Sequence, residues 1–176
     1  MTGLFNYEEM MNDLEAKVNQ SQKTDHEFTL GLIDIDNFDK INNNYGHKKG
    51  DEIIIAISDY LKESMRDYEK VYRQGGDEFG FILDENNKEN IKGFVDRIYQ
   101  CIMNIESYKA LEVDKGLSIG VTNFDGSIEG EPEELAGRLY KIADEAMYLS
   151  KRNNEVANVA MFDNDFKEKR FINIFG

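Results

Sequence analysis

The chain has 176 residues, of which 40% are hydrophobic, and its 35 Asp and Glu outweigh its 21 Lys and Arg to give a formal net charge of −14. This length fits one globular domain, and a core that can draw on 9 Tyr and 11 Phe argues against disorder. The acidic balance disfavours binding to nucleic acid or to an anionic membrane, because both require a positive patch. One cysteine excludes an intrachain disulfide. The longest apolar run is Ile53–Ile57 and no secretory signal is visible, so we expect a cytoplasmic domain without a membrane segment.

The first third of the chain predicts a helix, a strand and a second helix. Apolar residues recur at helical spacing over 7–18. Phe28–Ile35 is apolar almost throughout, which is typical of a buried strand. Asp36 then stands where the N-cap of a helix is expected. A turn is predicted over 42–46, and a strongly periodic helix over 54–65 follows it.

The rest of the chain predicts a hairpin and then alternating helices and strands. Two strand-like stretches, 71–73 and 79–83, flank Gly75-Gly76, a dipeptide suited to a tight turn that needs a positive φ. The later elements are expected as a helix over 91–105, a strand over 117–121, a helix over 135–149 that Pro132 opens, and a strand over 157–161. The order α-β-α-β-β-α-β-α-β predicts an α+β fold, with helices packed on a largely antiparallel sheet of about five strands.

Acidic residues gather at two predicted tips. Asp34 and Asp36 end the first strand, and residues two apart in a strand point to the same side. Asp77-Glu78 follow the two glycines of the hairpin. If the two tips are neighbours, their carboxylates converge, and such a cluster favours a hard divalent cation with oxygen ligands. The alternative is that Asp36 only caps a helix and that Asp77-Glu78 are only turn residues.

The pentapeptide Gly75–Phe79 resembles the signature of the GGDEF family, the diguanylate cyclases. Several further motifs resemble those of the family, in order and at its spacing: Met1–Asn6, Asp34–Phe38, Ile41-Asn42, Gly46-His47, Gly50-Asp51, Ser118–Val121 and Ala143–Tyr148. The resemblance covers residues 1–162, which we interpret as one GGDEF domain followed by a C-terminal extension at 163–176. The aromatic residues of that extension predict either a short helix docked on the domain or a contact with a partner.

The resemblance implies a ferredoxin-like, palm-type nucleotide cyclase fold and an enzyme of bacterial signal transduction. The implied reaction condenses two GTP molecules into cyclic di-GMP and releases two pyrophosphates. It also implies a homodimer in which each subunit holds one GTP, so that each 3′-hydroxyl attacks the α-phosphate held by the other subunit. A nucleotidyltransferase of this kind depends on divalent metal ions, Mg²⁺ or Mn²⁺, two per active site.

By matching position, the resemblance assigns the metal ions to Asp34, to the main-chain carbonyl of Ile35 and to Asp77. Glu78 is expected to support the same site or to contact the metal, so Asp77 and Glu78 are the implied catalytic residues. Asn42 and Asp51 match the pair that reads guanine. A carboxylate that accepts from N1–H and the 2-amino group favours GTP over ATP, which lacks both donors.

The implied phosphate contacts are partly altered in this chain. The main-chain N–H groups of Asn37, Phe38 and Asp39, at a helix start, are expected to face the terminal phosphates, together with Lys151. Relatives usually place a lysine at the position of Asp39, and an arginine at the position of Glu155. These departures leave open a second hypothesis, a catalytically weak GGDEF module that binds GTP or cyclic di-GMP as a regulator. A third, a palm-type cyclase acting on another nucleotide, is disfavoured by Asn42 and Asp51.

Product inhibition in the family uses an R-x-x-D motif ahead of the signature glycines. Here the corresponding positions are Arg66 and Glu69, which form a candidate inhibitory site with a longer acid. The alternative is an exposed charged turn. The opening motif of the family falls at residue 1. Two alternatives follow: a fragment whose signal comes from a fused or separate sensory or regulatory domain, or a stand-alone enzyme controlled by its own dimerisation.

Overall fold

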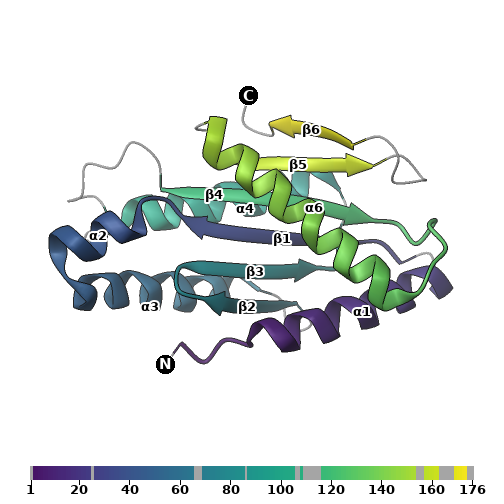
Figure 1. The fold of residues 1–176 in the computed structure, drawn as a ribbon, viewed down its shortest axis with the longest axis horizontal. Coiled ribbons are helices and arrows are strands. Elements are labelled where there is room, and N and C mark those ends of the chain that lie inside the picture. The colour runs from purple at the N-terminus through teal and green to yellow at the C-terminus, as the bar shows by residue number, and fades with distance from the viewer. Residues whose placement is uncertain are drawn as a thin grey trace.

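A single six-stranded sheet organises the molecule. The computed structural model describes residues 2–24, 26–65, 69–85, 87–105, 108, 116–153, 157–162 and 169–173. The strands stand in the order β2-β3-β1-β4-β5-β6 (Figure 1), and every neighbouring pair is antiparallel except β4 and β5. Their bounds are β1 Phe28–Ile35, β2 Lys70–Gly75, β3 Glu78–Leu83, β4 Leu117–Phe124, β5 Ala157–Phe162 and β6 Lys169–Asn173.

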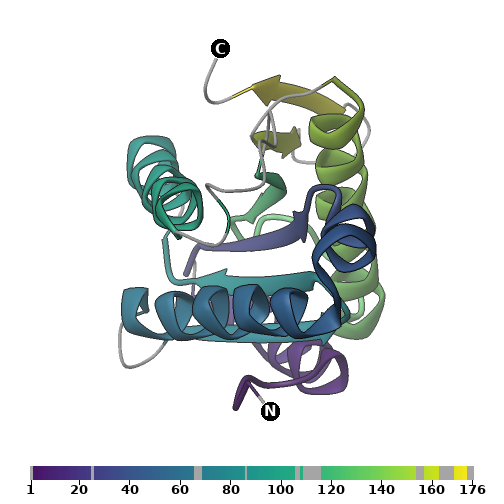
Figure 2. The ribbon, with the colours of Figure 1, turned by 90° about the vertical axis from the view of Figure 1, so that its left-hand side faces the viewer.

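Helices cover both faces of the sheet. Figure 2 shows α4 on one side and α6 on the other. One core layer joins α2, α3 and α4 to the sheet, and a second joins α1 and α6 to its other face. The helix bounds are α1 Tyr7–Thr24, α2 Phe38–Tyr45, α3 His47–Ser64, α4 Lys88–Asn104 and α6 Pro132–Asn153. Among the described residues, no helix is long and apolar enough to cross a lipid bilayer.

β1 is the central strand, and all eight of its residues are buried. Its apolar side chains alternate between the two core layers: Leu30 and Leu32 pack with α1 and α6, whereas Ile33 and Ile35 pack with α3 and α4. This double burial explains why the strand is apolar almost throughout instead of alternating with polar residues. The same alternation directs Asp34, at its end, toward the face that carries α6.

Close contact between β4 and α6 depends on Gly120. A Cβ atom there would lie 2.0 Å from the carbonyl oxygen of Ala143 and 2.3 Å from the backbone nitrogen of Met147. Both are main-chain atoms, so the helix could not move aside without shifting as a whole. The glycine of the Ser118–Val121 motif therefore brings α6 onto the sheet, and with it the residues of the last helical turn.

The predicted α+β architecture and the order of the nine predicted elements are confirmed, although the predicted second helix is divided into α2 and α3. The turn predicted over 42–46 is wrong in part, because Asn42–Tyr45 belong to α2 and only Gly46 separates that helix from α3. Of the two alternatives for the C-terminal extension, the short helix is wrong for residues 169–173, which form β6, pair with β5 and make a sixth strand. The division into a domain at 1–162 and an extension at 163–176 stays a prediction.

Candidate functional site

The end of β1 and the tip of the β2–β3 hairpin lie side by side at one end of the sheet. Asp34 is the cross-strand partner of Glu78 in the β1–β3 register. The backbone N–H of Ile35 donates a hydrogen bond to the carbonyl of Asp77, at 3.3 Å. In Figure 1 the start of α2 and the last turn of α6 lie at this same, left-hand end. Two predicted acidic tips that are far apart in sequence are therefore neighbours.

The hairpin tip is held in a defined shape. Gly76 has a φ of 45°, which favours glycine because a Cβ crowds the backbone in this region. The guanidinium of Arg73 donates two hydrogen bonds to the carbonyl of Gly76, at 3.1 and 2.6 Å. Next to it, the hydroxyl of Tyr140 on α6 lies 2.5 Å from the side-chain oxygen of Gln74. These bonds fix the two glycines and so set the position of Asp77.

The carboxylates at this end crowd one another. Burial and the charge of Asp34 raise the pKa of the Asp77 carboxyl, and the charge of Asp39 adds to that rise. Burial, followed by the charges of Asp34, Asp77 and Asp144, raises the pKa of the Glu78 carboxyl. Asp39, the residue that replaces the expected lysine, is thus close enough for its charge to repel the Asp77 carboxylate. A nearby cation would relieve this repulsion, because an opposite charge favours the ionised form of a carboxyl group.

Lys151 supplies a positive charge to this cluster. Its Nζ atom lies 2.7 Å from Oδ1 of Asp34, and Asp34 is only 8% exposed. Burial lowers the pKa of Lys151, but its hydrogen bond with Asp34 and the charges of Asp34, Asp36 and Asp77 outweigh that effect and raise the pKa overall. The lysine predicted to meet phosphate therefore binds a predicted metal ligand in this structure.

The prediction that Asp36 caps the next helix is wrong. The N-cap residue of α2 is Asn37, in a left-handed conformation with φ 59°, and its own side chain makes no capping hydrogen bond. Asp36 is buried, and its carboxylate accepts a hydrogen bond of 2.7 Å from the hydroxyl of Ser118 on β4. The left-handed residue turns the chain sharply from β1 into α2, so the first N–H groups of α2 follow directly after the acids.

The two residues predicted to read guanine lie on either side of the junction between α2 and α3. A Cβ atom on Gly50 would lie 2.1 Å from Oδ1 of Asn42, so the absence of a side chain at Gly50 makes room for this amide. Asp51 is the next residue along α3 and is exposed. An amide and a carboxylate at one helix junction can face the same edge of a base. Their role in binding guanine stays a prediction.

Sequence reasoning assigned no role to Asp144, although its motif was noted. It lies close enough to raise the pKa of Glu78. Tyr140, Asp144 and Lys151 follow one another at intervals of four and seven residues along α6. This spacing places all three on one face of the helix, so helical periodicity alone could have drawn attention to Asp144 once Lys151 was singled out.

The predicted metal ligands offer oxygen donors of the kind that Mg²⁺ and Mn²⁺ prefer. Among the residues that the structure describes, no group of three or more His, Cys, Asp and Glu side chains is arranged to hold a metal ion together. The carboxylates of Asp34 and Asp77 with the carbonyl of Ile35 do not make up such a group, and the contact of Glu78 with the metal stays a prediction. The donor chemistry of the predicted set fits a divalent cation, and a cationic ammonium already contacts Asp34.

Some predicted residues lie outside the described part of the chain. Arg66 of the candidate inhibitory site is one, and Glu155, the altered phosphate position, is another. Glu69 is described and directly precedes β2, and the candidate inhibitory site that it would form with Arg66 stays a prediction.

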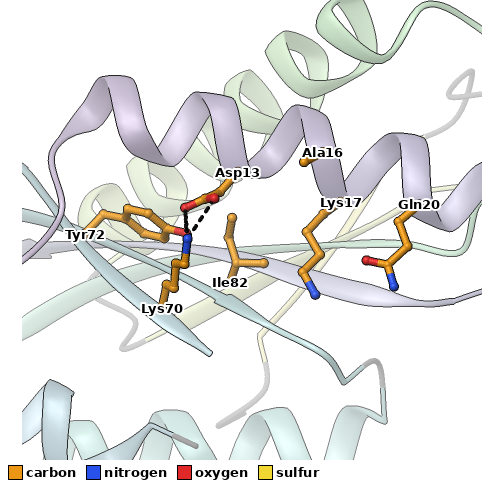
Figure 3. Close-up of a pocket in the computed structure, with 7 residues that line it drawn as sticks. All are labelled: Asp13, Ala16, Lys17, Gln20, Lys70, Tyr72 and Ile82. Carbon is orange, nitrogen blue, oxygen red and sulfur yellow. Dashed lines mark hydrogen bonds and ion pairs between the residues drawn. The ribbon is translucent and has the colours of Figure 1, made fainter. Parts of the chain in front are cut away.

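A separate hollow lies between α1 and the strands β2 and β3 (Figure 3). Lys70 donates to both carboxylate oxygens of Asp13 at 2.9 Å, and the Tyr72 hydroxyl donates to the same group at 2.8 Å. Ile82, which also lines the hollow, lies toward the end of β3 away from Glu78. These hydrogen bonds pair the polar groups of Asp13, Lys70 and Tyr72 with one another, so they stabilise the packing of α1 on the sheet.

Comparison with known proteins identifies the class to which this fold and site belong. The model of the family "Diguanylate cyclase, GGDEF domain" matches residues 1–156. The chain belongs to the GGDEF diguanylate cyclase domain family, as its motifs predicted.

Individual relatives agree with this assignment. Diguanylate cyclase DosC of Escherichia coli is 30% identical over 154 residues, which cover 86% of this chain and 32% of the relative. An uncharacterized membrane protein of Staphylococcus aureus is 31% identical over 170 residues, covering 93% of this chain and 45% of the relative. The chain thus spans about a third of the length of DosC and under half of the staphylococcal protein.

Solved structures show the same fold. The GGDEF domain of YfiN, also called TpbB, from Pseudomonas aeruginosa superimposes with a TM-score of 0.74 at 26% identity, over 87% of this chain and 93% of that one. The active GGEEF domain of a diguanylate cyclase from Vibrio cholerae gives a TM-score of 0.73 at 26% identity, over 85% and 92% of the two chains.

Proposed function

We propose that this chain is a metal-dependent diguanylate cyclase, which condenses two GTP into cyclic di-GMP as a cytoplasmic homodimer with one GTP per subunit. The observation that carries the proposal is the juxtaposition of Asp34 and Asp77, joined through the hydrogen bond from the Ile35 N–H to the Asp77 carbonyl. It supports the proposal because phosphoryl transfer requires mainly positioning and charge neutralisation.

Each group of residues has a distinct task in this proposal. Asp34, Asp77 and the carbonyl of Ile35 would hold divalent ions, which when bound neutralise phosphate charge and favour ionisation of the attacking 3′-hydroxyl. The N–H groups of residues 37–39 would bind the terminal phosphates. Asn42 and Asp51 would orient guanine. In each half-reaction a bond forms between a 3′-oxygen and the other nucleotide's α-phosphorus, and the bond to the β-phosphate oxygen breaks to release pyrophosphate.

A second function is favoured by one observation. Asp39 replaces the expected lysine, and its negative charge acts on Asp77 within the site. This added charge opposes a triphosphate, so the alternative is a weak GGDEF module that binds GTP or cyclic di-GMP and acts as a regulator.

Product identification separates these functions. The protein is incubated with Mg²⁺ and either GTP or ATP, and the product is identified by mass. Cyclic di-GMP from GTP that disappears in Asp77→Ala supports the cyclase. GTP binding without turnover at high protein concentration supports the regulator and contradicts the cyclase, whereas a product from ATP contradicts the guanine assignment.

A further inference from the structure

Asp34 is buried and already neutralised. At 8% exposure it lies at the end of a fully buried strand, where a carboxylate without a counter-charge would be strongly unfavourable. Lys151 provides that charge at 2.7 Å from Oδ1. The contact joins residues 117 positions apart in the chain, from the end of β1 and the last turn of α6.

The two partners differ in their freedom to move. Asp34 is anchored on β1, whereas the Lys151 side chain is 51% exposed even while it makes this contact. A lysine has a long, flexible stem and a compact charge. Lys151 can therefore leave Asp34 by rotating its side chain into solvent, and the backbone of α6, packed tightly at Gly120, need not move.

A divalent cation bound by Asp34 would compete with Lys151. The ammonium and the metal ion are both positive, and both would contact the carboxylate oxygens of Asp34. Their mutual repulsion favours binding of one of them at a time. The ammonium that leaves Asp34 remains on the last turn of α6, at the end of the sheet where the phosphates of a nucleotide are expected.

We propose that Lys151 is an exchangeable counter-ion: it occupies Asp34 in the metal-free domain, and metal binding displaces it toward the phosphate position. The inference rests on the proposed function, because it takes Asp34 as a metal ligand. It predicts that Lys151 weakens metal binding in the absence of nucleotide, although it stabilises the metal-free fold.

The first test measures Mn²⁺ binding to the nucleotide-free protein by calorimetry, with thermal unfolding of the same samples. Lys151→Met should bind Mn²⁺ several-fold more tightly than the original protein, and should unfold at a lower temperature without metal. Lys151→Arg, which keeps a cation for Asp34, should remain close to the original affinity. Lys141→Met removes the same charge from an exposed position ten residues earlier on α6 and should leave the affinity unchanged.

The second test uses the unaltered protein, so it does not depend on the folding of a variant. Amine-labelling rates measured by mass spectrometry should rise at Lys151 when Mn²⁺ is added, while those at Lys141 stay constant. Equal Mn²⁺ affinities in Lys151→Met and the original protein, or an unchanged labelling rate with metal bound, would overturn the counter-ion role and leave the metal site intact. Failure of both proteins to bind Mn²⁺ would overturn the proposed metal site and the exchange together.

Discussion

Asp77 occupies an unfavourable position for a charged side chain. It is partly buried, and the charges of Asp34 and Asp39 act on it. Acids placed together in this way repel one another, and such arrangements in proteins are concentrated at functional sites. The cost in stability at Asp77 is therefore consistent with a residue retained for binding cations.

Replacing this acid should stabilise the metal-free domain. The folded state raises the pKa of Asp77, so the folded protein holds its proton more tightly than the unfolded chain. The free energy of unfolding consequently decreases as the pH rises from the pKa of Asp77 in the unfolded chain to its higher pKa in the folded protein. Asp77→Asn removes this loss, so its melting temperature should exceed that of the original protein at neutral pH, by roughly 2–4 °C for each kcal/mol gained.

The advantage of Asp77→Asn should shrink as the pH falls through the raised pKa of Asp77, because the original carboxyl then becomes neutral too. Melting temperatures measured with a chelator across the acidic range check this trend. Asp59→Asn, at an exposed position on α3, is the matched control and should change little. A melting temperature of Asp77→Asn below that of the original protein at neutral pH would contradict the interpretation.

The junction of α2 and α3 is the element that would select the base. α2 spans only eight residues, and Gly46 alone separates it from α3. Gly50 is buried at the start of α3, and both the amide of Asn42 and the ring of Phe38 lie within 3.0 Å of where its Cβ would be. The position of the Asn42 side chain thus depends on a helix residue with no side chain.

Gly50→Ala should weaken GTP binding. The added methyl group would displace the Asn42 amide, and loss of one well-placed hydrogen bond costs about 1.4 kcal/mol, or a tenfold rise in KM. The melting temperature should change little, because alanine favours the helix by up to about 1 kcal/mol and offsets part of the strain. Steady-state kinetics with GTP and thermal unfolding measure the two effects.

Gly137→Ala is the control for this substitution. Gly137 lies within α6, and nothing is within 4 Å of the Cβ position. This variant should be slightly more stable and should keep the original KM. If Gly50→Ala also keeps the original KM for GTP, Asn42 does not contact the base.

At the scale of the whole molecule, the proposed reaction would make this site one half of a reaction centre. Each domain places its acids, its helix start and Lys151 at one end of the sheet. One bound GTP cannot supply both the attacking hydroxyl and the α-phosphate of a two-nucleotide condensation. The proposed reaction would therefore bring two domains to face each other through this end, and their net charges of −14 oppose that encounter.

Activity should consequently depend on protein concentration. Turnover per subunit is expected to fall on dilution once the dimer dissociates, and fusion to a dimeric coiled coil should restore it. Light scattering over the same concentrations reports the oligomeric state. Constant turnover per subunit in samples that scatter as monomers would contradict the facing-dimer arrangement.

Local signals in the sequence predicted most of the elements, and long-range contacts account for the errors. The hairpin was predictable because Gly75-Gly76 determine a turn on their own. Asp36 looked like a helix cap because its hydrogen-bond partner, Ser118, is 82 positions away. β6 was missed because its backbone is ordered by pairing with β5, which a short stretch of sequence does not reveal. The ion pair of Lys151 with Asp34 had no local signal either.

The central claim is that Asp34 and Asp77 jointly bind divalent ions beneath a nucleotide triphosphate. A crystal structure with Mn²⁺ and a non-hydrolysable GTP analogue tests it most directly, because anomalous scattering locates the metal. We predict Mn²⁺ between Asp34, the Ile35 carbonyl and Asp77, with the phosphates above it and Lys151 turned away from Asp34. Mn²⁺ and nucleotide bound elsewhere, with Lys151 still on Asp34, would contradict the account.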